Sequence, residues 1–111
     1  MATISNLYVD AGANYSTIIT VAATNGQPLN LTGYTVASQM RKSYQSTTAY
    51  AFTASVFDAV TGKIRLQLTA LQSEAIPAGR WLYDVEITSS TGTKTRVVEG
   101  IVTVNPQITQ I

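Results

Sequence analysis

Few side chains in this sequence are of the types that carry out catalysis. The 111 residues include no histidine and no cysteine, which excludes His-based triads, disulfides and thiolate metal sites. Asp84 and Glu86 would share one face of a strand about 7 Å apart, a spacing that suits paired catalytic carboxylates or a calcium ion. Lys94 or Arg96 on the next strand would face them in cross-strand ion pairs, and we favour this structural role. We therefore expect no enzymatic activity, no cofactor and no metal site.

A second group of candidate functional residues surrounds a loop rich in Ser and Thr. Tyr44 and Tyr50 bracket the loop, and Arg41 and Lys42 close the strand before it. Exposed tyrosines can anchor a protein interface or stack on a sugar, although packing of the loop onto the domain would produce the same pattern. Trp81 fits the core better than a ligand platform. We therefore predict that Arg41, Lys42, Tyr44 and Tyr50 belong to an interface.

The composition favours a subunit of an assembly. Only 12% of the residues are charged, and seven basic and six acidic side chains leave a formal charge of +1 without any run of one sign. Nucleic-acid binding is therefore not expected. No stretch resembles a signal peptide or a membrane span, so residence in a cytoplasm is the default expectation. A chain with so little charge repulsion is suited to contact with other subunits.

Short alternations of apolar and polar residues predict an all-β fold. Gly, Pro, Asn and Asp clusters separate the alternations, and no stretch keeps a helical period over three turns. The clearest alternations cover residues 15–23, 34–41, 49–57, 63–68, 81–88 and 94–104. About seven short strands are typical of an immunoglobulin-like, two-sheet antiparallel sandwich, and a small barrel gives a similar pattern. The sharp corner before Trp81 favours the sandwich.

Two of these segments have the most distinct inward faces. The aliphatic face between residues 63 and 68 and the largely aromatic face between residues 81 and 88 should both enter the core, and residues 81–88 should form a hairpin with residues 94–104. Between these segments, Thr69 is expected to cap one helical turn. The inward-facing residues are Ile64, Leu66, Leu68, Trp81, Tyr83, Val85 and Ile87.

We expect one domain over residues 1–106, because a chain of this length supports one hydrophobic core. Residues 107–111 alternate polar and apolar side chains after Pro106 and form a short tail. Ile108 and Ile111 would suit this tail to adding to the sheet edge of a neighbouring subunit.

The order of several short motifs resembles the small immunoglobulin-like domain of tailed-phage virion proteins. Similar domains occur at the N-termini of phage baseplate upper proteins and of related tail or fibre proteins. The motifs span nearly the whole chain, although each recurs in many sandwiches. They are NGQPLNLTGY (residues 25–34), QMRKS (39–43), GKI (62–64), LT (68–69), AGRWLYDV (78–85), VEG (98–100) and VTV (102–104).

The resemblance implies a non-catalytic bacteriophage structural protein that docks onto other virion subunits and is a homo-oligomer in a symmetric assembly. Its location would be the virion, assembled in the cytoplasm of the bacterial host, with no nucleic-acid or membrane partner. A ring, adaptor or fibre attachment in the tail or baseplate fits best. A capsid decoration protein is the alternative, and a module that binds carbohydrate or the host surface is a third possibility. The baseplate proteins continue into a stalk and a receptor-binding module, and we expect neither for this single domain.

Overall fold

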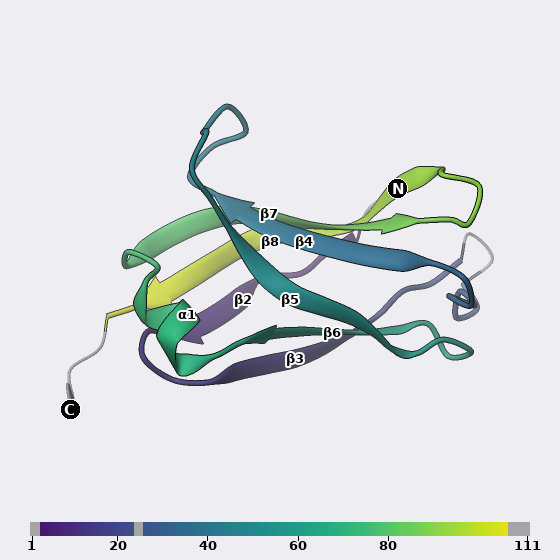
Figure 1. Ribbon diagram of the computed structural model, residues 1–111, viewed down its shortest axis with the longest axis horizontal. Coiled ribbons are helices and arrows are strands. Elements are labelled where there is room, and N and C mark those ends of the chain that lie inside the picture. Colours follow the sequence, from purple (N-terminus) through teal and green to yellow (C-terminus); the bar gives the residue numbers. More distant parts are fainter. Residues whose placement is uncertain (1–2, 24–25, 107–111) are drawn as a thin grey trace.

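Extended backbone dominates the chain, as the alternating pattern predicts. The structure is a computed structural model, and it describes residues 3–23 and 26–106. Within them are eight strands and one short helix (Figure 1). The elements are β1 (Thr3–Ile4), β2 (Leu7–Asp10), β3 (Tyr15–Thr20), β4 (Thr35–Arg41), β5 (Ala49–Asp58), β6 (Lys63–Leu68), α1 (Ala70–Glu74), β7 (Gly79–Thr88) and β8 (Lys94–Asn105).

The strands form one curled, mixed sheet. Their order is β1-β8-β7-β4-β5-β6-β3, and β2 also pairs with β8. The ten residues of β5 connect the two halves of the sheet, because the first part of β5 pairs with β4 up to Phe52 and the second part pairs with β6 from Thr53 onward. In Figure 1, β5 accordingly crosses the front of the molecule diagonally between β4 and β6.

The all-β class is confirmed, but the two-sheet antiparallel sandwich is not, because the strands form one continuous sheet. The described residues form eight strands in place of about seven, and the pairing is not purely antiparallel because β1 and β2 both run parallel to β8. The parallel pairs form because the N-terminal segment lies beside β8 and runs in the same direction. The phenol of Tyr83 donates a 2.5 Å hydrogen bond to the carbonyl of Ser5, and the side-chain oxygen of Asn6 accepts the N–H of Ile101 at 3.1 Å.

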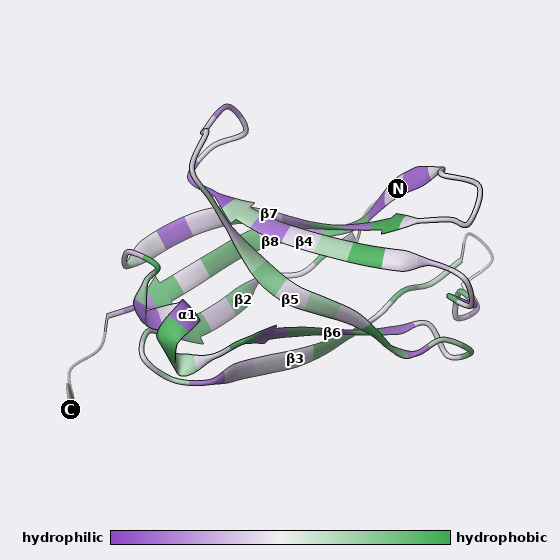
Figure 2. Ribbon diagram, viewed as in Figure 1, coloured by the Kyte–Doolittle hydropathy of each residue, from purple (hydrophilic) through white to green (hydrophobic). Residues whose placement is uncertain are grey.

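The predicted inward faces are confirmed. Ile64 and Leu66 are fully buried, Leu68 is nearly so, and Trp81, Tyr83, Val85 and Ile87 are each at most 4% exposed. These residues belong to one continuous core that also includes Met40, Phe52 and the buried valines of β2 and β8. Figure 2 shows the corresponding alternation of apolar and polar bands along β4 and β8. One core inside one curled sheet therefore holds the strands in register.

The short helix α1 begins where the sequence predicts. Thr69 accepts the backbone N–H of Gln72, and the Gln72 side chain accepts the backbone N–H of Thr69, which completes a capping box. Inside the helix, Ser73 is fully buried and donates a hydrogen bond to the carbonyl of Ala13 at 2.8 Å. The helix thus ties the turn before β3 to the turn before β7.

The tail with Ile108 and Ile111 lies outside the described residues, and its predicted role remains a prediction. The only helix of the described chain has five residues, which is far too short to cross a membrane.

Candidate functional site

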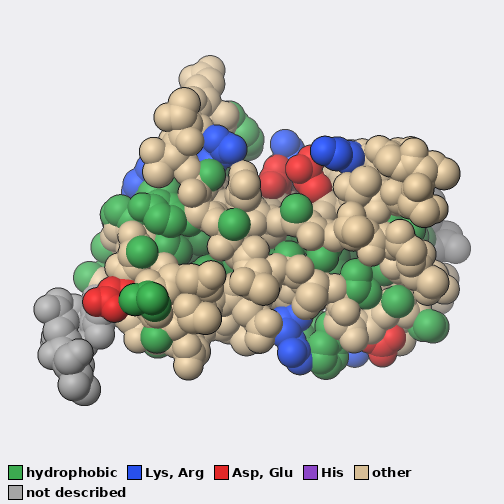
Figure 3. All heavy atoms as spheres, viewed as in Figure 1, with side chains coloured by type: hydrophobic (Ala, Val, Ile, Leu, Met, Phe, Trp, Pro, Cys, Tyr) green, Lys and Arg blue, Asp and Glu red, His purple; other side chains and the backbone are tan. Residues whose placement is uncertain are grey.

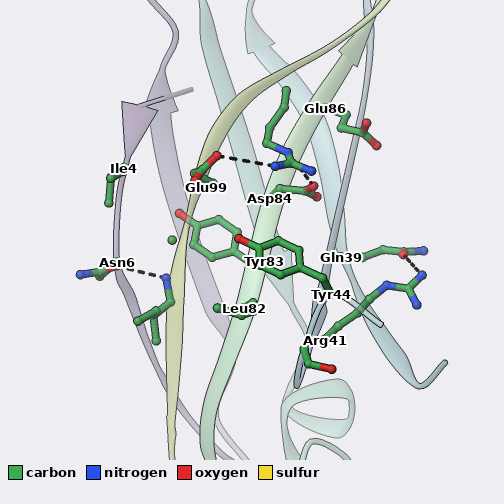
Figure 4. A pocket seen from close by; sticks show the side chains of 14 residues that line it. Ile4, Asn6, Gln39, Arg41, Tyr44, Leu82, Tyr83, Asp84, Glu86 and Glu99 are labelled. Atoms are coloured by element: carbon green, nitrogen blue, oxygen red, sulfur yellow. Dashed lines mark hydrogen bonds and ion pairs between the residues drawn. The ribbon is translucent and has the colours of Figure 1, made fainter. Parts of the chain in front are cut away.

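A groove of about 780 Å³ crosses the outer face of the sheet. Its floor comes from β1, β8, β7 and β4, and residues of the loop after β4 form one wall. Figure 3 shows the hollow beside this projecting loop, with acidic and basic side chains next to one another in it, and Figure 4 shows the lining side chains. The lining includes Ile4, Asn6, Gln39, Arg41, Ser43, Tyr44, Leu82, Tyr83, Asp84, Glu86, Arg96, Glu99, Gly100 and Ile101.

Strand register explains which residues meet in the groove. One row across the sheet joins Arg41, Leu82 and Ile101. The next row on the same face joins Gln39, Asp84 and Glu99, and Ile4 of β1 lies beside Glu99. An apolar row and a charged row therefore run side by side, because residues two apart on a strand share one face.

An ion-pair network occupies the charged row. Arg96 Nε lies 3.1 Å from Asp84 Oδ2, and an Arg96 terminal nitrogen lies 3.7 Å from Glu99 Oε2 (Figure 4). The predicted cross-strand pairing of Asp84 is thus confirmed for Arg96. Lys94 instead lies across from Thr88, beyond the groove. Asp84 is therefore held by a cation, as a structural role requires.

A β-bulge gives Arg96 this position. Val85 lies opposite Val98, whereas the next residue, Glu86, lies opposite Arg96, so Val97 is an extra residue in β8. Such bulges redirect side chains on the longer strand. Arg96 is directly across from Glu86, yet its side chain reaches diagonally to Asp84.

The carboxyl of Asp84 has a raised pKa. Burial is the largest cause because it disfavours the charged form, and the nearby Arg96 guanidinium opposes this rise in the pKa. The negative charges of Glu86 and Glu99 add to the upward shift. No cluster of three or more His, Cys, Asp or Glu side chains within residues 3–23 and 26–106 could hold a metal ion.

The predicted interface residues separate into two groups. Arg41 and Tyr44 line the groove, and the Tyr44 side chain is 76% exposed. The Arg41 guanidinium donates hydrogen bonds to the carbonyl of Ser46 and to the side-chain oxygen of Gln39. Arg41 therefore connects the strand to the projecting loop and is not merely a solvated charge at the end of the strand.

Lys42 and Tyr50 instead secure the base of the loop against the core. The Tyr50 ring meets Trp81 edge-on with the ring centroids 5.3 Å apart, and the Lys42 ammonium lies 4.7 Å from the centroid of the Trp81 ring. Lys42 also donates a hydrogen bond to the carbonyl of Arg80 at 3.1 Å. Trp81 itself is 4% exposed, so the three aromatic residues do not form one exposed patch.

Sequence reasoning missed the apolar side of the groove. Ile4 is 74% exposed and Ile101 is 37% exposed, and neither was a candidate. Leu82 lies between Arg41 and Ile101 in the same row. Alternation places Leu82 and Ile101 on the outer face of their hairpin, but Ile4 joins them only through the parallel pairing of β1 with β8.

Comparison with known proteins adds a likeness of fold. No protein-family model matches the sequence, and no curated protein does so. The solved N-terminal domain of ORF48 from phage TP901-1 has a TM-score of 0.59 and 15% identity, over 91% of this chain and 85% of that chain.

Two other solved structures are more distant. One is a family 123 glycoside hydrolase from Clostridium perfringens, with a TM-score of 0.42 and 7% identity over 95% of this chain and 23% of that chain. The other is AggA, the major subunit of aggregative adherence fimbriae type I from Escherichia coli, with a TM-score of 0.40 and 12% identity over 90% of this chain and 89% of that chain. Both scores are too low to bear on function.

Proposed function

We propose that this chain is a non-catalytic structural protein of a bacteriophage particle, which docks onto other virion subunits in the tail or baseplate as a ring, adaptor or fibre attachment. The observation that carries the proposal is the likeness of its fold to the N-terminal domain of phage TP901-1 ORF48, over most of both chains. The order of turn and strand motifs along the sequence supports the same assignment.

The outer groove is the surface we assign to docking. Ile4 and Tyr44 are about three-quarters exposed, and they frame the network of Asp84, Arg96 and Glu99. Exposed apolar side chains beside charged groups are typical of protein interfaces, where aromatic residues fill the partner's pockets and polar groups fix the orientation. A partner subunit with an apolar anchor and a complementary charged rim would fit this groove.

The available side chains support a role without catalysis. The sequence has no histidine or cysteine. Asp84 is paired with Arg96. Burial raises the pKa of Tyr83 to about 12, and its phenol is held by the carbonyl of Ser5, so this group stays protonated at neutral pH. Two titratable groups of the groove, Asp84 and Tyr83, are thus already engaged in structural bonds.

Capsid decoration is the second candidate, because the same surface could dock onto a capsid lattice. A carbohydrate-binding role has less support, since Tyr44 is exposed while Trp81 is buried and Tyr50 packs against Trp81. Stacking on sugars is strongest where aromatic faces are open to solvent.

Immunogold electron microscopy of particles from cells that carry the gene would test the location. An antibody raised against the purified domain should label the tail or baseplate, and the protein should be present in the purified particles by mass spectrometry. Labelling of the capsid would replace the tail assignment with decoration. Absence of the protein from purified particles would overturn the virion role.

Complementation with surface variants would test the groove. We expect Tyr44→Ala combined with Arg41→Glu to lower incorporation into particles at least about tenfold, because the interface loses an aromatic anchor and a charge is reversed. Leu71→Ala is the matched control, since Leu71 is 78% exposed on α1 and lies outside the groove. Equal incorporation of both variants would remove the groove from the proposal.

A further inference from the structure

Strand β3 ends the sheet at an open edge. It pairs with β6 from Tyr15 to Thr20, and no other strand of the described residues lies on its far side. An open edge carries backbone N–H and C=O groups that can pair with another extended chain.

The hydrogen-bonding phase of β3 identifies these groups. Val21 donates its N–H to the carbonyl of Gly62 at 2.8 Å, and this pair continues the β3–β6 register by one residue. Because the direction of N–H and C=O alternates along a strand, odd-numbered residues face β6 and even-numbered residues face outward. Ser16, Ile18 and Thr20 therefore direct their backbone groups to the open edge, and all three side chains are exposed.

The edge lacks the features that usually prevent pairing. Its six residues include no charge and no proline, and its register with β6 is unbroken. Natural edge strands are usually shortened, charged, bulged or covered. The opposite edge is divided into two short strands, β1 of two residues and β2 of four residues, and β2 ends in the charged Asp10. Strand β3 is thus the longer, uncharged edge of the sheet.

We propose that β3 pairs antiparallel with β3 of a second copy, about a two-fold axis at Ile18. In this register Ile18 lies opposite Ile18 of the second copy, and Ser16 lies opposite Thr20 of the second copy. Each of the three opposed pairs consists of residues whose N–H and C=O point across the edge, so each pair exchanges two hydrogen bonds. The symmetric register satisfies every outward-facing backbone group of β3 and continues the sheet through both copies.

Packing supports the same arrangement. Thr17 and Ile19 on the inner face of β3 are only partly buried, whereas their partners on β6, Leu66 and Ile64, are fully buried. An added strand would cover this open end of the core. On the outer face Ile18 is 45% exposed and would meet its own copy at the axis. Apolar cross-strand pairs of this kind stabilise sheets.

The nearest charges do not oppose self-association. Lys63 and Arg65 lie one strand inward on β6, so equivalent charges of the two copies would be separated by three strand spacings, about 14 Å. This exceeds the Debye length of about 8 Å at physiological salt. The Arg65 guanidinium also lies over the Phe57 ring at 4.3 Å, on the β5 side and away from the edge. The proposal stands independently of the virion role.

Sedimentation velocity over a concentration series of the full chain would test the inference. The wild-type chain should sediment as a dimer that dissociates on dilution. Ile18→Lys should raise the dissociation constant at least about tenfold, because two like charges would face each other at the axis. Tyr8→Lys is the matched control, since Tyr8 is 68% exposed on β2 at the opposite edge and outside the groove, and it should leave the dimer intact.

A charge-swap mixture separates self-pairing from misfolding. Ile18→Glu alone should also be monomeric, and an equimolar mixture of the Lys and Glu variants should restore the dimer as a heterodimer. A wild-type chain that remains monomeric at all concentrations, or a mixture that stays monomeric, would overturn the proposal. Loss of the dimer on truncation after Pro106, with Ile18→Lys still dimeric, would show that the tail is the occupant and would also overturn it.

Discussion

Gly100 is the position at which a single methyl group would test the attachment of the N-terminal strands. A Cβ on this residue would overlap the carbonyl oxygen of Ser5, lie 2.8 Å from its carbonyl carbon and lie 3.1 Å from the Asn6 side-chain oxygen. Because the first two contacts are with backbone, a side-chain rotation cannot relieve them. Gly100→Ala should therefore displace the segment between β1 and β2 from β8.

The expected cost follows from the hydrogen bonds that this displacement breaks. Each contributes about 1 kcal/mol net, so losing three gives a decrease of about 3 kcal/mol in the free energy of unfolding. A domain of this size loses roughly 4 °C in Tm per kcal/mol, which predicts a decrease of about 12 °C. The bonds are Tyr83 phenol to Ser5 carbonyl, Ser5 N–H to Glu99 carbonyl and Ile101 N–H to Asn6 Oδ1.

Urea unfolding followed by the fluorescence of Trp81, the single tryptophan, would measure this change. Gly92→Ala is the control, since Gly92 has a φ of 91° and no atom within 4 Å of an added Cβ. That variant should lose only about 1 kcal/mol, the cost of left-handed backbone for a residue with a Cβ. If Gly100→Ala unfolds at the wild-type urea concentration, or loses no more stability than Gly92→Ala, the explanation of the parallel attachment is wrong.

Three further predictions concern the helix, the ion pair and the groove. Thr69→Ala should lower the free energy of unfolding by about 1 kcal/mol in urea titrations, because it removes the capping box. Burial raises the pKa of Asp84, so the folded state holds this proton more tightly than the unfolded state, and the contribution of Asp84 to stability falls as pH rises from 3.8 through the raised pKa. The Tm of Asp84→Asn relative to wild type should accordingly increase with pH over this window in calorimetry, and a constant difference would contradict the shift. Tyr44→Ala should change the free energy of unfolding by less than about 0.5 kcal/mol, because the side chain is 76% exposed, and a larger loss would show that Tyr44 belongs to the packed fold.

Local patterns in the sequence were sufficient to predict the strands that lie next to each other along the chain. The alternation around Leu66 and Trp81 reports which side chains are buried, and Thr69 with Gln72 provides a capping signal within four residues. The hairpin of β7 and β8 follows because a short turn leaves few alternatives. These features need no information from distant residues.

Parallel pairing and the path of β5 depend on distant residues. Thr3 pairs with Val98, and no local pattern specifies this partner. The pairing of β5 changes between Phe52 and Thr53 without a proline or glycine to mark it. The curl of the whole sheet decides that change. The order of the strands in the sheet therefore cannot be predicted from patterns within short stretches of the sequence.

The candidate site was predicted in part for the same reason. The pairing of Asp84 with Arg96 follows from the hairpin, although the bulge at Val97 decides which carboxylate is nearest. Arg41 and Tyr44 line the groove, whereas Tyr50 faces Trp81 because its strand phase places it inward opposite Met40. Composition predicts a role in contacts between subunits, and strand phase decides which residues are exposed for such a role.

A cryo-electron microscopy reconstruction of phage particles from cells that carry the gene would test the central claim most directly. We predict density for the domain at a symmetric position in the tail or baseplate, with Tyr44 and Ile4 buried against a neighbouring subunit. A particle that lacks the domain, or one in which this face is open to solvent in every copy, would contradict the account.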